Sequence, residues 1–376
     1  MPRMPSPGAE SLSARLSPRL SLRLHAAIAD AGGWLGFDGF MARALYEPGL
    51  GYSARGTPVF GAMPGFGEGR GSDFVTAPEL SPYFGRTLAR QVAQALAATG
   101  THEVLEFGAG SGALAEQLLD ALGDNLQRYT IVDVSGTLRE RQALRLARFA
   151  PRVTWLDAWP ARIEAVVVGN EVLDAMPVQL LHFDGQQWLE RGVVSDGEGF
   201  TWRDRPTTQR PPADAAFMPG TVTEIHAQAE AFIRSLAERM QRGAAFFIDY
   251  GFPEAEYYHP QRTGGTLMCH QAHRADADPL VHVGDKDITA HVNFSAVALV
   301  GQDAGLQVLG YTSQARFLLN CGLPELLQGA GIRETTMAQK LITEHEMGEL
   351  FKVLGFVKGA DFGAIGFAAG DRSHTL

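Results

Sequence analysis

A glycine-rich segment that begins at Glu106 has the spacing of a cofactor-binding turn. In the sequence Glu-Phe-Gly-Ala-Gly-Ser-Gly, glycines fall at 108, 110 and 112, between an apolar run and an amphipathic stretch. Glycines between a strand and a helix let the backbone approach a ligand closely. We therefore expect this turn to bind a nucleotide-like cofactor.

The glycine spacing alone fits two kinds of cofactor. Gly108, Gly110 and Ala113 also satisfy the dinucleotide pattern G-x-G-x-x-G/A, and Asp133 follows at a distance that suits a ribose. Glu106 separates the two, because a carboxylate at the strand end would repel a pyrophosphate and attract an ammonium and a sulfonium. The sequence predicts S-adenosylmethionine, and an NAD-dependent oxidoreductase stays as an alternative.

Acidic residues follow the next two expected strands. Asp133 is predicted to accept hydrogen bonds from both ribose hydroxyls, and Asp157 from the exocyclic amine of adenine. For Asp133 the alternative is a capping role at the next helix.

A further polar group follows the fourth strand. Asn170, Glu171 and Asp174 would lie at the carboxyl edge of the sheet, where open α/β sheets bind ligands. Carboxylates match the fork of a guanidinium and stabilise positive charge on it. We predict that these three residues are catalytic and face the transferable methyl group, while a helix N-cap with first-turn acids is the structural alternative.

The elements that must position these residues alternate between strands and helices. This rhythm predicts a doubly wound, mostly parallel α/β sheet with inserted hairpins, a Rossmann-like fold. The expected strands are 103–107, 129–134, 153–156, 165–169, 244–250, 307–311 and 365–369; the expected helices are 86–98, 113–122, 137–149 and 222–242; hairpins are expected in 180–203.

Composition shifts divide the chain before the glycine turn. The division is a disordered leader at 1–24, a helical and loop-rich cap at 25–98, and a Rossmann-like domain at 99–376 with insertions at about 180–220 and 252–295. Residues 60–71 are glycine-rich and are expected to form a mobile lid or to be disordered.

Charge and composition exclude several classes of protein. The 376 residues carry a formal net charge of −10, which argues against general nucleic-acid binding. No apolar run is long enough to enter a membrane, and the histidines between 270 and 291 are too unevenly spaced for a metal site. The two cysteines suggest a reducing compartment, so we expect the bacterial cytoplasm. The arginines of the leader leave the mitochondrial matrix as an alternative.

Six segments in order give the chain a family resemblance. They are Tyr46-Glu-Pro-Gly-Leu-Gly-Tyr52, Asp73-Phe-Val-Thr-Ala-Pro-Glu79, Glu106 to Gly112, Asn170 to Pro177, Ile248-Asp-Tyr-Gly251 and Asp287-Ile-Thr-Ala-His-Val-Asn-Phe294. With these the chain resembles the MidA-like methyltransferases. The resemblance implies a class I methyltransferase fold; mitochondrial members of that family are respiratory complex I assembly factors that methylate a protein arginine.

The resemblance also implies roles for particular residues. Thr76, Pro78 and Glu79 would approach the cofactor, and Gly108, Gly110 and Asp133 would hold its two ends. The expected function is methyl transfer to an arginine of a protein substrate, such as a respiratory complex subunit. An S-adenosylmethionine-binding chaperone without turnover is a second alternative, and the inserted hairpins suggest a homodimer.

Overall fold

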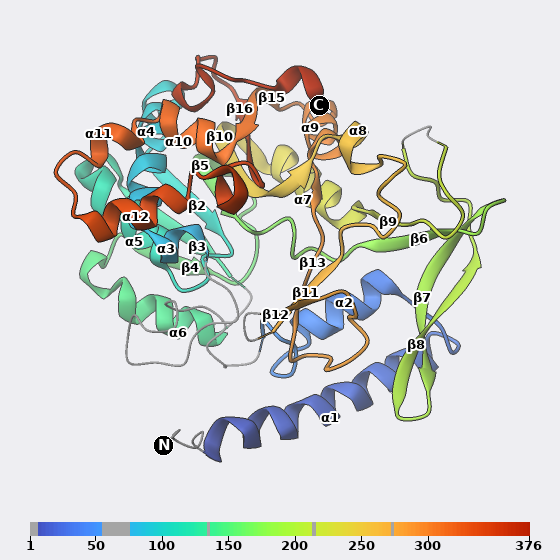
Figure 1. The fold of residues 1–376 in the computed structure, drawn as a ribbon. Helices are drawn as coiled ribbons and strands as arrows, with labels where there is room; N and C mark the ends of the chain where they lie inside the picture. The colour runs from blue at the N-terminus through green and yellow to red at the C-terminus, as the bar shows by residue number, and fades with distance from the viewer. Residues whose placement is uncertain (1–6, 55–75, 134–135, 213–215, 272–273) are drawn as a thin grey trace. The chain divides into compact units, whose positions relative to one another are not determined.

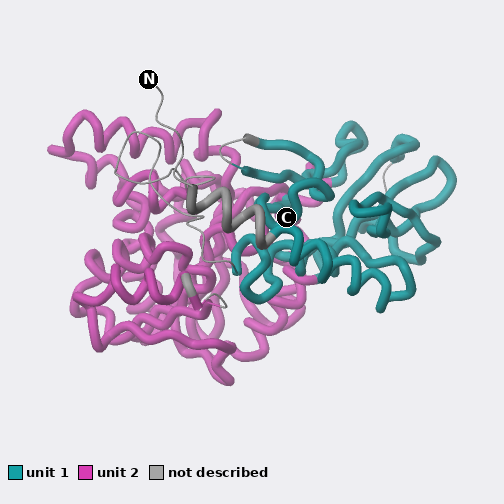
Figure 2. The backbone as a smooth tube through the Cα atoms, turned by 90° about the horizontal axis from the view of Figure 1, so that it is seen from below, with its two compact units in different colours: residues 1–57, 176–227, 258–290 teal, residues 58–175, 228–257, 291–376 magenta. Residues whose placement is uncertain are grey.

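A computed structural model describes residues 7–54, 76–133, 136–212, 216–271 and 274–376. The predicted lid at 60–71 lies outside these residues. The chain forms two compact units, each built from three separate segments (Figure 2). Unit 1 comprises Met1–Thr57, Met176–Ala227 and Tyr258–Ala290, and unit 2 comprises Pro58–Ala175, Gln228–Tyr257 and His291–Leu376.

Unit 2 is built on a mostly parallel sheet with the strand order β15-β16-β10-β5-β2-β3-β4 (Figure 1). Strands β4, β3, β2, β5 and β10 pair in parallel, and β16 runs antiparallel between β10 and β15. The predicted doubly wound α/β fold is confirmed. The strands are β2 (Glu103–Phe107), β3 (Arg128–Val132), β4 (Val153–Leu156), β5 (Ile163–Asn170), β10 (Met240–Phe252), β15 (Gln307–Ser313) and β16 (Phe351–Lys358).

Helices cover both faces of this sheet because its central strands are apolar on both sides. In β10, Phe246 faces the core cluster that includes residues of α4, α5 and α10, while Phe247 packs edge-on against Phe232 of α7. On that second side, Gly301 of α9 lies against the ring of Phe356 in β16. The main helices are α4 (Tyr83–Thr99), α5 (Ala113–Leu122), α6 (Gly136–Arg145), α7 (Ala227–Arg239), α9 (Phe294–Asp303) and α10 (Gln314–Asn320).

Unit 1 contains the predicted antiparallel insertion. Tight turns at Gly185 and Gly197 have φ values of 102° and 58°, which favour glycine, and they join β6 to β7 and β7 to β8. This sheet contains β1 (Leu35–Gly36), β6 (Gln179–Phe183), β7 (Trp188–Asp196), β8 (Gly199–Pro206) and β9 (Val222–Ile225); a second one contains β11 (Met268–Gln271), β12 (Arg274–Asp276) and β13 (Asp287–Thr289).

Helix α1 (Pro7–Asp30) occupies most of the segment that the sequence predicted to be a disordered leader. That prediction is wrong for residues 7–24. Leu20, Leu24 and Ile28 follow the i, i+4, i+8 spacing of one helix face and are fully buried or nearly so. Burial of this stripe within unit 1 outweighs the unfavourable Pro18.

Three other predicted boundaries are wrong. The helix expected at 222–242 begins only at Ala227, because Val222–Ile225 pairs with β6 as strand β9. The strand expected at 365–369 is a short 3-10 helix, Ile365–Phe367, and the strand that completes the sheet is β16. The cap expected at 25–98 is divided, since its first part belongs to unit 1 and α4 belongs to unit 2.

Five other α-helices and one other strand belong to the described chain. They are α2 (Phe37–Tyr46), α3 (Ala77–Leu80), α8 (Glu254–Tyr257), α11 (Leu323–Leu326), α12 (Ile332–Lys340) and β14 (Val292–Asn293). Among the described residues, no helix combines the length and apolarity needed to cross a membrane.

Adjacent leucines on α1 provide a test of its packing. Leu24 is fully buried and Leu22 is 70% exposed. We expect Leu24→Ala to lower the free energy of unfolding by about 2–4 kcal/mol through lost burial and a residual cavity. The matched variant Leu22→Ala should change it by less than about 0.5 kcal/mol. Urea unfolding followed by circular dichroism measures both, and equal small effects would show that α1 does not pack.

Candidate active site

Most of the predicted site residues lie near the carboxyl edge of strands β2 and β5. Strands β2 and β5 are adjacent in the sheet, and the direction in which successive strands are added reverses between them. From β2 the sheet continues to β3 and β4 on one side, and from β5 it continues to β10 on the other. The loops after both strands touch, because a Cβ on Gly108 would lie 3.1 Å from Cγ2 of Val172. Open α/β sheets bind ligands in the crevice at such a switch point.

The glycine turn adopts a backbone conformation that side chains disfavour. Gly108, Gly110 and Gly112 have φ values of 65°, 54° and 82°. Gly112 donates a hydrogen bond to the carbonyl of Ala109 at 2.7 Å, and α5 starts at the next residue. The turn therefore places backbone close to the sheet edge with no Cβ at three positions, as close approach of a ligand requires.

The side chain of Glu106, near the end of β2, lies inside the protein close to this turn. It is buried, and Oε2 accepts a hydrogen bond from the Tyr129 hydroxyl at 2.7 Å. Burial raises the pKa of Glu106 from 4.5 to about 8; the bond from Tyr129 opposes that rise, and the Asp133 carboxylate adds to it. A cation bound nearby would favour the ionised carboxylate.

Asp133 is tied to the glycine turn through Gln142 of α6. Gln142 Nε2 donates to Asp133 Oδ2 at 2.8 Å and to the carbonyl of Gly110 at 2.9 Å. The sequence analysis missed Gln142. Its signal was weak: a polar residue four positions before buried Leu146, on the inward face of α6.

The residues predicted to approach the cofactor from the N-terminal side contact the same turn. Glu79 Oε1 accepts hydrogen bonds from the Ser111 hydroxyl and from Arg145 Nη1, the latter at 3.1 Å. The carbonyl of Pro78 accepts from Gln117 of α5 at 2.8 Å, and Thr76 is the buried residue that precedes α3. Arg145 and Ser111 are further residues that the sequence analysis missed.

The segment after β5 has a strained backbone at its acidic residue. Glu171 has a φ of 54°, which is uncommon for a residue other than glycine. Asn170 Nδ2 donates to Glu171 Oε1 at 3.0 Å, and Asp174 is buried two residues beyond Val172. The segment thus presents an amide and two carboxylates beside the glycine turn.

Buried Asp249, at the end of β10, fixes this segment. Its Oδ2 accepts from the backbone N–H groups of Val172, Leu173 and Asp174 at 3.1, 2.9 and 3.3 Å. Burial, and after it the Glu171 carboxylate, raise the pKa of Asp249 to about 8, while the backbone donors oppose the rise. Asp249 therefore positions the backbone that follows Glu171 and includes Asp174.

Asp157 lies apart from this buried cluster. Its side chain is 88% exposed and forms an ion pair with Arg139 of α6 at 2.5 Å. Arg139 also donates to the carbonyl of Asp133 at 3.4 Å. Arg139 therefore links Asp157 to Asp133, another of the predicted cofactor residues.

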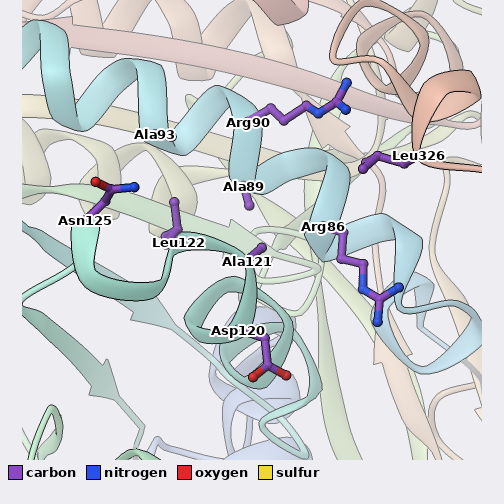
Figure 3. A pocket seen from close by; sticks show the side chains of 9 residues that line it. All are labelled: Arg86, Ala89, Arg90, Ala93, Asp120, Ala121, Leu122, Asn125 and Leu326. Carbon is purple, nitrogen blue, oxygen red and sulfur yellow. The ribbon is translucent and has the colours of Figure 1, made fainter.

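A separate cavity of about 490 Å³ lies at the other end of α5, between α4, α5 and α11 (Figure 3). It is lined by Arg86, Ala89, Arg90, Ala93, Asp120, Ala121, Leu122, Asn125 and Leu326. It contains none of the predicted site residues and is about 15 Å along the helix from the glycine turn.

Within the described part of the chain, no group of three or more His, Cys, Asp or Glu side chains could hold a metal ion.

Comparison with known proteins identifies the family. Residues 87–312 match the family model Methyltransf_28, whose members are S-adenosyl-L-methionine-dependent methyltransferases. This covers more than half of the chain, and the chain belongs to that family. The class I methyltransferase fold and the predicted MidA-like family are thereby confirmed.

Two solved structures cover the whole chain. The first is the crystal structure of a protein from Burkholderia thailandensis bound to S-adenosyl-homocysteine. It is 52% identical to this chain, the match covers 100% of both chains, and the TM-score is 0.92. A native structure from the same organism is 50% identical over 100% of both chains, with a TM-score of 0.89. The cofactor predicted from Glu106 and the glycine turn, S-adenosylmethionine, is confirmed at the level of the family.

More distant relatives have named activities. The Danio rerio protein arginine methyltransferase NDUFAF7, mitochondrial, is 27% identical and aligns over 85% of this chain and 83% of its own length. The Homo sapiens protein of that name is also 27% identical, over 74% of this chain and 70% of its own length.

The raised pKa of buried Glu106 predicts how the stability of the protein changes with pH. Because the folded state raises the pKa of Glu106 from 4.5 to about 8, it retains a proton that the unfolded state releases. The stabilisation is complete below the unfolded value and is lost as pH rises through the folded value. We expect the free energy of unfolding to fall between about pH 5 and pH 8, by up to about 1.4 kcal/mol per unit for this group.

Glu106→Gln keeps the shape of the side chain and removes the titration. Urea unfolding at a series of pH values should show a shallower decline for this variant than for the wild type. Asp249 shifts in the same direction, so part of the slope should remain. An identical slope in both proteins would contradict the burial of an ionisable Glu106.

Proposed function

We propose that this S-adenosylmethionine-dependent methyltransferase transfers a methyl group to an arginine nitrogen of a protein substrate. The observation that carries the proposal is the group Asn170, Glu171 and Asp174 beside the glycine turn. Within the described chain, Asn170 Oδ1 is buried and accepts no hydrogen bond, so it offers an acceptor to an incoming donor. The names of the mitochondrial relatives support the same acceptor.

The residues at the sheet edge fit the cofactor chemically. We assign Gly108 and Gly110 to backbone contact with it, and Glu106 to the electrostatic attraction of its cationic end. Asp133 would accept from the ribose hydroxyls, and Asp157 would accept from the adenine amine, which would compete with Arg139 for the Asp157 carboxylate. Thr76, Pro78 and Glu79 would close the site from α3.

The acceptor residues would position a guanidinium. Glu171 and Asp174 present carboxylates that match its planar donors, and Asn170 Oδ1 adds a neutral acceptor. Held in this way, the positive charge concentrates on the nitrogens that face the carboxylates, and the remaining nitrogen gains nucleophilic character. The strained backbone at Glu171 is consistent with a residue whose position matters for reactivity.

When bound, the cofactor supplies a methyl group on a sulfonium; the bond from carbon to sulfur breaks with its electron pair on sulfur as the bond to nitrogen forms. The protein has to align the acceptor nitrogen at about 3 Å from that carbon and exclude water. The proton that the guanidinium loses can pass to Glu171 and then to solvent. Positioning therefore contributes more to the rate than a strong base would.

Wider biological roles are extensions of this proposal. The names of the relatives suggest support of respiratory complex assembly, with a complex subunit as the substrate. We propose the bacterial cytoplasm as the location, with the mitochondrial matrix as the alternative, and a homodimer formed through the hairpins of unit 1. The chaperone alternative differs in one respect: it predicts cofactor binding without turnover.

Glu171→Gln tests the acceptor role. We expect methyl transfer to fall by about 100-fold or more, because a neutral amide does not stabilise the cationic acceptor. Affinity for S-adenosylhomocysteine should stay within about threefold. The assay uses S-adenosylmethionine with a tritiated methyl group, a cell extract as the source of acceptors, and amino-acid analysis of the hydrolysed protein.

The matched control is Glu164→Gln. Glu164 lies near the start of β5, at the end opposite to Glu171, and pairs with Arg242 at the surface, so this variant should label as the wild type does. Label in methylarginine supports the proposal. Label in methyllysine or in base-labile esters contradicts the arginine acceptor, and cofactor binding without any label favours the chaperone.

A further inference from the structure

Gln142 is a buried polar side chain with no assigned role. It lies on α6 and is fully buried, at a helix position where an apolar residue would be expected. A buried amide is retained only where its hydrogen bonds are satisfied. Its partners therefore indicate what it does.

The amide contacts three separate parts of unit 2. As described above, its nitrogen donates to Asp133, after β3, and to the carbonyl of Gly110, in the glycine turn. Its oxygen accepts from the indole N–H of Trp155 in β4 at 3.0 Å. Both donors and the acceptor of the amide are used.

Trp155 fixes which way the amide faces. An indole N–H only donates, so the Gln142 oxygen has to face it, and the NH₂ group has to face Asp133 and Gly110. Both of those partners are acceptors, which agrees with this orientation. The carboxylate of Asp133 is consequently held at a fixed position relative to the carbonyl of Gly110.

We propose that Gln142 is a positioning residue for the cofactor, which locks the ribose-binding carboxylate of Asp133 to the glycine turn. This rests on the cofactor roles proposed for Asp133 and Gly110. A carboxylate has lone pairs for several donors, so the bond to Gln142 is compatible with acceptance from ribose hydroxyls. Without the amide, the carboxylate loses its bond to Gln142, and no single side chain then links it to the carbonyl of Gly110.

Calorimetric titration with S-adenosylhomocysteine tests this coupling. We expect Gln142→Leu to weaken binding by about 10- to 100-fold, in the range of a lost hydrogen bond to a charged group. Asp133→Asn should weaken it similarly. The double variant should be no more than about threefold weaker than Asp133→Asn alone, because the two residues act as a unit.

The preference of the protein for a ribose over a 2′-deoxyribose in the ligand is a second measurement. It would not change if Gln142 only stabilised the fold. The wild type should prefer S-adenosylhomocysteine over its 2′-deoxyribose analogue by about tenfold or more. Both Gln142→Leu and Asp133→Asn should reduce this preference to less than about threefold. Gln142→Met gives a second variant of similar length and volume that loses both donations and the bond from Trp155, and it should show the same loss of preference.

Gln91→Leu is the matched control for removal of a buried glutamine. Gln91 is also fully buried, donates to Gln94 and accepts from the backbone of Gly366, on α4 and away from the glycine turn. It should lower stability in urea unfolding and leave the affinity and the ribose preference within about twofold of wild type.

Each other result overturns a distinct claim. If Asp133→Asn binds as the wild type does, the proposed cofactor site is wrong, and the role of Gln142 with it. If Asp133→Asn weakens binding but both Gln142 variants keep wild-type affinity and ribose preference, only the inference about Gln142 fails. Multiplying losses in the double variant would also overturn it, since they would show independent action.

Discussion

The backbone conformation of the glycine turn is the constraint on which the site depends. Three residues between β2 and α5 have φ values between 54° and 82°, a region that side chains disfavour. This turn lets the loop after β5 pack against it at Gly108 and exposes the Gly110 carbonyl to Gln142. Ser111 links the same turn to Glu79. A bulkier residue in the turn would disturb all three connections.

Glu106 and Asp249 are buried acidic side chains of unit 2 that lie next to the candidate site. Glu106 and Asp249 both have a raised pKa, chiefly because of burial, and each has specific donors that offset part of that effect. Tyr129 supplies the donor to Glu106, and three backbone N–H groups supply those to Asp249. The first arrangement places beside the glycine turn an acid that a bound cation would favour in its ionised form, and the second holds the backbone of residues 172–174.

Local sequence patterns predicted the parallel sheet well because its strands are short, apolar and followed by polar residues. The bounds of β2, β4 and α5 agree with the prediction, since each begins or ends at a clear change in pattern. Strand β16 was missed because Lys352 and Gly355 interrupt its apolar run, although both residues are buried in the sheet. The leader was predicted to be disordered because its prolines and arginines hid an apolar stripe that is stabilised only by packing.

The candidate site could be located from sequence but its connections could not. Polar residues at the ends of parallel strands meet at one edge, so Glu106, Asp133 and the segment from Asn170 were identifiable from position alone. The bridge through Gln142, the brace from Asp249 and the left-handed backbone at Glu171 depend on contacts between distant segments. Such contacts leave no periodic signal.

The central claim is that the glycine turn binds S-adenosylmethionine. Calorimetric titration of the wild type and of Gly110→Val with S-adenosylmethionine, S-adenosylhomocysteine and NADH tests it most directly. The control is Gly363→Val, where a Cβ would meet open space. We predict that the wild type and the control bind both adenosyl compounds, that Gly110→Val loses both, and that NADH does not bind. Binding of NADH alone, or unchanged binding in Gly110→Val, would contradict the account.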